Sequence, residues 1–340
     1  MKLKALILIS LLAFSTNLIA KESIFVKFGA WVVYWDFNRG YEELRRFGQV
    51  FDKTSLFAYE IDSRGFPVRA KELTYSKIKK FVFLAKRKKI EPWLTLVNDV
   101  RLKNGRVLLK ESFPLKKLFS NKKLTEYQIN SIIHILKKYG FKGIDIDFEK
   151  IPENLSEKYG NYITKLIYKL KEQKLGCNVI VEPYNGPLPY WGTANLTVMS
   201  YNLHWSKTLP GPRSTSKFIK EIVKRVEGDA KGSPGIAIVL KGFLWERNGK
   251  VRRVDFSEGE NIKINNPGKI KRDEGSKIPF IKFENGDELW YDDVVSLKDK
   301  IKTSIKAGYK RIMFWYLGGN PVKFFYLLNS YKKDFKGANK

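Results

Sequence analysis

Eight short apolar runs, rich in β-branched and aromatic residues, alternate along this chain with segments of helical period. The runs are residues 27–35, 54–61, 90–98, 143–149, 178–184, 196–202, 235–242 and 311–317. Between most of them the apolar residues fall on one helix face, as in 74–88, 124–139, 155–170, 217–227, 295–307 and 321–331. Eight strands alternating with helices favour a (β/α)8 barrel, the TIM barrel; a doubly wound open sheet is the alternative.

Two segments depart from this alternation. The connection 185–195 contains two prolines and no helical period, so we expect the barrel helix there to be missing or vestigial. In residues 246–292, Gly, Asn and charged residues alternate with short β-like pairs, and no helical stripe is found. We predict a small β-rich insertion between strand seven and helix seven, packed over one lip of the barrel.

The N-terminus has the pattern of an export signal. A basic start, MKLK, precedes an apolar stretch at 5–14 and a polar-to-small stretch at 15–20. The apolar stretch is shorter than the about 20 residues that span a bilayer. We expect a signal peptide at 1–20 and one barrel domain at 21–340. Cleavage after Ala20 would place Leu18, not a small residue, at position −3, so an uncleaved anchor stays open, as does a buried N-terminal helix.

The chain is strongly basic, with 64 Lys and Arg against 35 Asp and Glu, a net charge of +29. Removal of residues 1–20 would delete Lys2 and Lys4 and no acidic residue, which leaves +27. Such a charge favours nucleic acid, anionic lipid or an anionic cell wall as partner. For an exported protein we expect the cell envelope or periplasm, and no nucleic acid. No later segment is long and apolar enough to cross a membrane.

Cysteine and histidine are scarce. The single cysteine, Cys177, excludes an internal disulfide, and His134 and His204 are the only histidines. A zinc site of the Cys/His kind is therefore not expected, and we predict no metal and no cofactor. We expect a monomer.

The chemistry is concentrated in one strand, with the sequence KGIDIDFEK. Asp145, Asp147 and Glu149 stand at alternate positions, so all three side chains point one way, into the barrel, while the apolar residues between them point outwards. Burial and mutual repulsion of stacked carboxylates raise at least one pKa. The last acid lies at the carboxyl end of the strand, where barrel active sites lie. The alternative is an edge strand with a solvated acidic face.

A carboxyl group with a raised pKa at a barrel mouth suits a general acid, as in glycoside hydrolysis. The usual scheme places two carboxylates on either side of the sugar. Here the acids lie on one strand, which suits a different scheme, in which the 2-acetamido oxygen of the substrate attacks the anomeric carbon.

Three motifs resemble glycoside hydrolase family 18, the chitinase family. Residues 142–149 resemble its DGxDxDxE signature, with Lys142 in place of the first Asp. Met199 and Tyr201 match the sixth-strand MxYD motif, whose Asp is Asn202 here, and Trp315 matches the tryptophan of the eighth strand. Residues 210–212 and 289–301 look like the spore-germination branch of the family. The resemblance covers roughly residues 27–330.

The resemblance implies a role for each matching residue. Glu149 would protonate the leaving oxygen, and Asp147 would accept the acetamido N–H. Asp145 would share a proton with Asp147, and Tyr201 would hold the acetamido carbonyl. Trp315 would form the floor beneath the sugar in the −1 subsite, and Asn202 would orient the substrate. Further candidates for substrate binding are Met199, Tyr34, Trp35, Tyr59, His204 and Trp290.

Three functions remain open. The first is an exported retaining glycoside hydrolase acting on β-1,4-linked N-acetylglucosamine in chitin, peptidoglycan or a related glycan. The second is an inactive family member that binds such glycans as a lectin, which Lys142 and Asn202 keep open. The third is an envelope protein that binds polyanions through charge alone. The sequence does not indicate the natural glycan or endo versus exo action.

Overall fold

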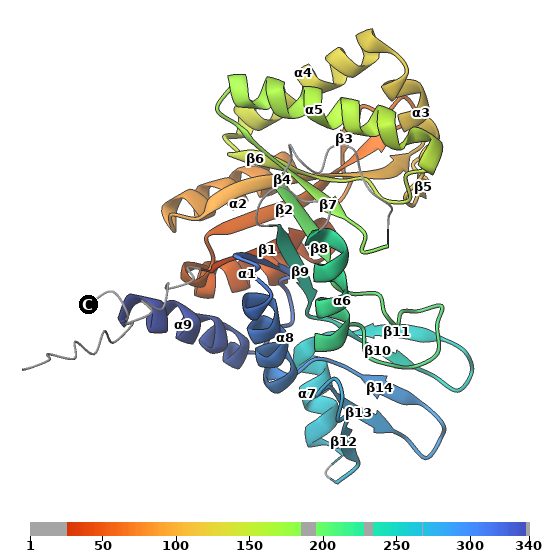
Figure 1. Ribbon diagram of the computed structural model, residues 1–340, viewed down its shortest axis with the longest axis vertical. Helices are drawn as coiled ribbons and strands as arrows, with labels where there is room; N and C mark the ends of the chain where they lie inside the picture. The colour runs from red at the N-terminus through yellow and green to blue at the C-terminus, as the bar shows by residue number, and fades with distance from the viewer. Residues whose placement is uncertain (1–25, 185–194, 228–233, 267, 338–340) are drawn as a thin grey trace, which may run out of the picture.

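The computed structural model describes residues 26–184, 195–227, 234–266 and 268–337, and its centre is a closed barrel of eight parallel strands (Figure 1). Strand β2 pairs with both β1 and β4, and this closes the ring. The strands are β1 Lys27–Val33, β2 Lys53–Asp62, β4 Glu91–Arg101, β6 Gly143–Asp147, β7 Gly176–Val181, β8 Asn195–Met199, β9 Gly235–Val239 and β15 Arg311–Trp315. The predicted (β/α)8 barrel and its eight strands are confirmed.

Helices enclose this barrel. They are α1 Phe37–Phe47, α2 Tyr75–Arg87, α3 Phe113–Phe119, α4 Lys122–Tyr139, α5 Ser156–Glu172, α6 Ser216–Glu227, α8 Val294–Lys306 and α9 Val322–Gly337. All six predicted helical segments are present, whereas α1 and α3 were not predicted. In α1 the stripe is interrupted by Gly40, which packs so closely that a Cβ there would lie 3.0 Å from the Leu317 carbonyl oxygen.

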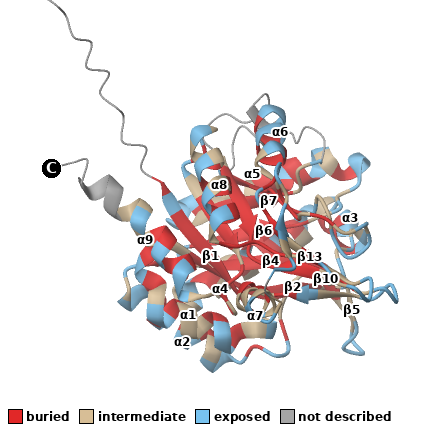
Figure 2. Cartoon of the chain, turned by 90° about the horizontal axis from the view of Figure 1, so that it is seen from below, coloured by how far each residue is buried: buried red, intermediate tan, exposed pale blue. Residues whose placement is uncertain are grey.

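The core has two layers. The larger layer lies between the strands and the helices, and Figure 2 shows its buried centre enclosed by helices with exposed outer faces. Strand β6 shows the division: Ile144 and Ile146 belong to the outer layer, whereas Asp145 and Asp147 are buried among the inward-facing side chains. The predicted faces of this strand are therefore correct.

The insertion lies between β9 and α8, as predicted, and contains a five-stranded sheet in the order β11-β10-β14-β13-β12. Its strands are β10 Gly242–Trp245, β11 Val251–Val254, β12 Ile270–Arg272, β13 Pro279–Lys282 and β14 Glu288–Trp290. The sheet begins at Gly242, earlier than the predicted boundary at residue 246. The Trp245 indole N–H donates to the Thr208 carbonyl at 3.0 Å, and the Ser257 N–H donates to the Gly319 carbonyl at 2.9 Å. These bonds fix the insertion to the loops after β8 and β15.

The insertion is β-rich, as predicted, and it also contains a helix that was not predicted, α7 Phe256–Ile264. The Asp255 carboxylate caps this helix by accepting the Glu258 N–H at 2.9 Å. Gly259 lets the helix approach the Tyr291 ring, since a Cβ there would lie 2.4 Å from a ring carbon. This helix carries no apolar stripe, so the periodicity of the sequence did not predict it.

Two short strands, β3 Pro67–Arg69 and β5 Val107–Leu108, pair antiparallel with β2 and β4 near their carboxyl ends. The predicted signal at 1–20 and residues 185–194 of the irregular connection lie outside the described residues. None of the described helices is long and apolar enough to cross a membrane.

Candidate active site

A cleft of about 440 Å³ opens at the carboxyl ends of the barrel strands. Asp147 ends β6, Met199 ends β8 and Trp315 ends β15, and all three line it. This is the end of the barrel at which enzymes of this fold place their active sites. The structure brings eight of the predicted residues together here: Asp147, Glu149, Tyr201, Trp315, Met199, Asn202, Tyr34 and Trp35.

The ammonium group of one lysine contacts two of the carboxylates in the cleft. The Lys110 ammonium lies 2.6 Å from Glu149 Oε1 and 3.5 Å from Asp147 Oδ2. Asp147 Oδ1 is buried and has no hydrogen-bond partner among the described residues. Burial raises the pKa of Asp147 to about 7; Lys110 opposes the rise, and Glu149 and Asp99 add to it. Asp147 therefore exchanges a proton near neutral pH.

The backbone after β6 is fixed by an asparagine on the neighbouring strand. The Asn98 side chain accepts the Glu149 N–H at 3.0 Å and donates to the Glu149 carbonyl at 2.9 Å. Next to it, the Asp99 carboxylate accepts the Lys110 N–H at 3.0 Å. Glu149 and Lys110 thus lie beyond their strands and are nevertheless held in place. The sequence analysis missed Asn98, Asp99 and Lys110; for the first two, polar residues at the end of a strand were the available signal.

Asp145 lies deeper and does not line the cleft. Its Oδ1 accepts hydrogen bonds from Lys53 Nζ at 2.6 Å and Asn178 Nδ2 at 2.8 Å. The ammonium of Lys53 lies 3.7 Å from the centre of the Trp93 ring. The structure thus gives Asp145 an ion pair with Lys53, and the sharing of a proton with Asp147 stays a prediction.

The segment after β8 contributes a hydroxyl and an amide. Tyr201 is buried, and burial together with the nearby Asp147 and Glu149 raises the pKa of its phenol. The phenol therefore remains protonated and able to donate a hydrogen bond. Asn202, with a φ of +69°, accepts a hydrogen bond at 2.7 Å from the Arg213 guanidinium.

Aromatic rings form another part of the cleft. Trp315 contacts Trp31 edge-on at a centroid distance of 5.6 Å and Phe57 at 5.1 Å. Trp35, in a short 3-10 helix at Tyr34–Asp36, is 43% exposed and lies 6.2 Å from Trp315. Such exposed ring faces suit stacking against sugars. The sequence analysis did not select Trp31 or Phe57, although alternation along β1 and β2 turns both inwards.

Besides Asp145, three residues predicted to bind substrate lie outside the cleft. Tyr59 packs in the outer core, because register shifts in β2 on either side of it interrupt the alternation that began with Phe57. The ring of His204 is held by its contact with the Leu209 carbonyl, at 3.0 Å. Trp290 stacks on Phe280 in the insertion sheet, with ring centres 4.5 Å apart. These three are not placed to bind substrate in this cleft.

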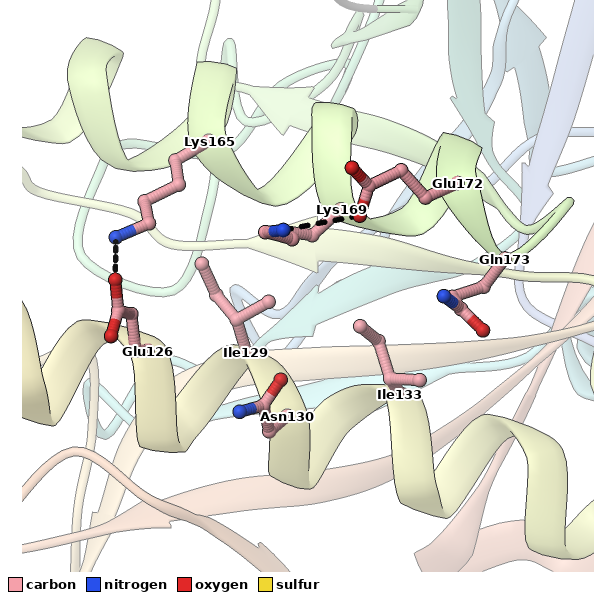
Figure 3. A pocket seen from close by; sticks show the side chains of 8 residues that line it. All are labelled: Glu126, Ile129, Asn130, Ile133, Lys165, Lys169, Glu172 and Gln173. Atoms are coloured by element: carbon pink, nitrogen blue, oxygen red, sulfur yellow. Dashed lines mark hydrogen bonds and ion pairs between the residues drawn. The ribbon is translucent and has the colours of Figure 1, made fainter.

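A second groove, of about 470 Å³, lies on the outer surface between α4 and α5 (Figure 3). Two ion pairs take up its charged groups: Lys165 pairs with Glu126 at 2.9 Å, and Lys169 pairs with Glu172 at 3.1 Å. None of the described residues that line it is aromatic. Although the groove is slightly larger than the cleft, it offers neither an unpaired acid nor a surface for a sugar.

A closed barrel with an acid pair and an aromatic wall at the carboxyl ends of its strands is the architecture of a glycoside hydrolase. The model of the family "Glycosyl hydrolases family 18" matches residues 32–320 of the chain. The chain belongs to this family, as the sequence motifs predicted.

The relatives include enzymes of bacterial spores and chitinases. The cortical fragment-lytic enzyme of Bacillus subtilis is 21% identical over 262 residues; the match covers 68% of this chain and 58% of that protein's length. The spore cortex-lytic enzyme SleL of Bacillus cereus shares the fold, with a TM-score of 0.78, 19% identity, and coverage of 90% of this chain and 74% of that one. A chitinase from Chromobacterium violaceum has a TM-score of 0.78 and 18% identity, with coverage of 90% of this chain and 99% of that one.

Proposed function

We propose that this protein is exported and hydrolyses a glycan that contains β-1,4-linked N-acetylglucosamine, either chitin or a glycan of the cell envelope. The observation that carries the proposal is the placement of Asp147 and Glu149 side by side in a cleft that also contains Tyr201 and Trp315. The names of the relatives, a chitinase and lytic enzymes of the spore cortex, support this class of substrate. The N-terminal signal pattern supports export.

The positions of the cleft carboxylates favour a scheme in which the nucleophile belongs to the substrate. Among the described residues, Asp99, Asp147 and Glu149 are the carboxylates that line the cleft, and all come from the neighbouring strands β4 and β6 or just beyond them. The other strands present amide, phenol and aromatic groups to the cleft. A retaining or inverting pair would need a second carboxylate on the other side of the sugar. The acetamido oxygen of the substrate takes this role in the proposed scheme.

Each group then has one task. The acetamido oxygen forms a bond to the anomeric carbon while the glycosidic bond breaks, and Glu149 gives its proton to the leaving oxygen. Asp147 accepts the acetamido N–H and stabilises the positive charge that develops on the cyclising sugar. The Tyr201 hydroxyl donates to the acetamido oxygen and aligns it. Glu149 then takes a proton from the water that opens the cyclic intermediate, so the product keeps the β configuration.

Lys110 must change partner during this cycle. Its ammonium contacts Glu149 in the free protein, in the region that the leaving oxygen would enter. When the sugar enters, Lys110 would release Glu149 and stay near Asp147, where its charge favours the ionised carboxylate that accepts the N–H.

Product analysis tests the proposal. Purified peptidoglycan and chito-oligosaccharides are digested, the fragments are weighed by mass spectrometry, and the first product is followed by proton NMR. We expect cleavage at N-acetylglucosamine and a β-anomer, with competitive inhibition by a thiazoline mimic of the cyclised sugar. Inversion, or equal cleavage of fully de-acetylated chitosan, would overturn the scheme. Binding without turnover would instead support the glycan-binding alternative.

A further inference from the structure

Behind Asn202, which lines the cleft, lies a buried arginine that forms no ion pair with a described residue. Arg213 is 9% exposed and donates to Asn202 Oδ1 at 2.7 Å and to the Lys241 carbonyl at 3.4 Å. Its Nε is buried and has no hydrogen-bond partner among the described residues. Both acceptors are neutral, so no carboxylate pairs with this guanidinium. Burial and the charge of Arg253 lower its pKa to about 10.

A second arginine faces the cleft itself. Arg253, on β11 of the insertion, lines the same cleft as Glu149 and Trp315. Its side chain is exposed and makes no hydrogen bond or ion pair with any described residue. Its strand neighbour Arg252 points to the other face of the sheet and pairs with Glu258. The insertion therefore presents one unpaired guanidinium to the substrate.

No ion pair between described residues joins either arginine to an acid of the cleft. Asp147 and Glu149 contact the ammonium of Lys110 instead. Position 202 is an Asp in the sixth-strand motif of the family and an Asn in this chain, and the uncharged Asn202 Oδ1 accepts the hydrogen bond from Arg213. Both guanidiniums thus lack a carboxylate contact from the described residues, and Arg213 is in a desolvated place where its charge acts strongly on an anion.

We propose that Arg253, with Arg213 behind it, forms a subsite for the carboxylate of an acidic sugar adjoining the N-acetylated sugar that is cleaved. The free lactyl carboxylate of N-acetylmuramic acid has this chemistry. A planar guanidinium binds a carboxylate through two parallel hydrogen bonds, which favours an acidic over a neutral glycan. The inference rests on the proposed function and adds to it a preference for glycans whose lactyl carboxyls are free, over glycans in which they are amidated or, as in chitin, absent.

Binding to a protein that cannot turn over tests this subsite separately from catalysis. In the Glu149→Gln variant, calorimetry compares two tetrasaccharides of alternating N-acetylglucosamine and N-acetylmuramic acid, one with free lactyl carboxylates and one with the same groups as methyl amides. Chitotetraose is the third ligand. We expect the free acid to bind about tenfold more tightly than the amide at low salt, as for one charge-assisted contact.

Two further substitutions should remove this preference. Arg253→Gln removes the contact, and Asn202→Asp neutralises Arg213 and repels the anion, so each should bring the acid-to-amide affinity ratio close to one. Arg252→Gln, on the same strand but the opposite face, is the matched control and should leave the ratio unchanged.

Equal affinity for the acid and the amide in the Glu149→Gln protein would overturn the subsite. If chitotetraose still binds in that case, the proposed glycan function stands and the inference alone fails. If none of the three ligands binds and the wild-type protein hydrolyses none of them, both proposals fail. Loss of the ratio in Arg252→Gln as well would assign the effect to general surface charge and overturn the role of Arg253.

Discussion

The ammonium group of Lys110 lies between two carboxylates, 2.6 Å from Glu149 and 3.5 Å from Asp147. Burial disfavours the charge on this lysine, but the charges of Asp147, Glu149 and Asp99 together raise its pKa above the ordinary value. The lysine therefore remains a cation at neutral pH. A substrate that needs the proton of Glu149 must displace this contact.

Glu149→Gln should keep the fold and remove nearly all turnover, because the leaving oxygen loses its proton donor. The amide retains the size of the side chain, and the backbone bonds to Asn98 do not depend on the carboxylate. Turnover of a chito-oligosaccharide measures the effect, and circular dichroism checks the fold. Rates close to those of the wild type would contradict the assignment of the acid.

Lys110→Met should move the acidic limb of kcat/KM to higher pH. Lys110 lowers the pKa of Asp147, which burial raises to about 7, so its removal raises that pKa further. Asp147 must be ionised to accept the acetamido N–H, and more alkaline solution is then needed to ionise it. The pH profile of kcat/KM gives the shift. Lys103→Met, on an exposed lysine of the same hairpin, is the control, and an identical limb in both variants would contradict the prediction.

Asp147→Asn should slow turnover by a factor of about 10²–10⁴. It should also stabilise the fold, relative to wild type, more at high pH than at low pH. The pKa of Asp147 is about 7 in the folded protein, against 3.8 for an ordinary Asp. The wild-type fold therefore loses stability as pH rises from about 4 to about 7, where the buried carboxyl ionises. The amide does not ionise, so the melting temperature of the variant relative to wild type should be higher at pH 8 than at pH 4.5. A difference that is constant with pH would contradict the raised pKa.

Lys300→Met should destabilise the protein by about 3–5 kcal/mol, the loss expected when one partner of a buried ion pair is removed. Lys300 in α8 is fully buried and contacts both oxygens of Asp292, at 2.6 and 2.8 Å. Removal of the lysine leaves the Asp292 charge in the core. Urea denaturation measures the loss, and Lys298→Met on the exposed face of the same helix is the control. Equal urea midpoints for the two variants would contradict the expected loss of stability.

Retention on isolated anionic cell walls should fall steeply as salt is added. A net charge of +27, that of the chain without residues 1–20, attracts such a surface through Coulomb forces that salt screens. Co-sedimentation of the Glu149→Gln protein with cell walls at low and high ionic strength measures binding without digestion. Unchanged retention would show that charge is not what holds the protein there.

The barrel could be predicted because its elements bury continuous or periodic apolar faces. Strand β6 shows the limit of this reasoning. Alternation placed Asp145, Asp147 and Glu149 on one side correctly, yet Lys53, the partner of Asp145, comes from a distant strand that only barrel closure brings near. No local pattern contains that pairing.

The missed and misplaced residues depend on irregular backbone. Lys110 reaches the acids because the β4–β5 hairpin folds back and the lysine adopts a φ of +57°, which the sequence does not reveal. Tyr59 lies outside the cleft because of register shifts in β2, which the periodicity of the sequence does not reveal. Arg253 comes from the insertion, and its position depends on how that sheet lies on the barrel.

The first and last strands of the insertion, β10 and β14, pair with each other, Phe243 opposite Trp290. The two ends of the segment therefore leave the barrel side by side, and the chain between them can be exchanged as one contiguous cassette. The acids proposed to break the glycosidic bond and the arginine proposed to select the sugar are thus encoded in separable stretches of the chain. A related barrel could acquire a different glycan preference by recombination of this cassette, while Glu149 and its supports remain untouched.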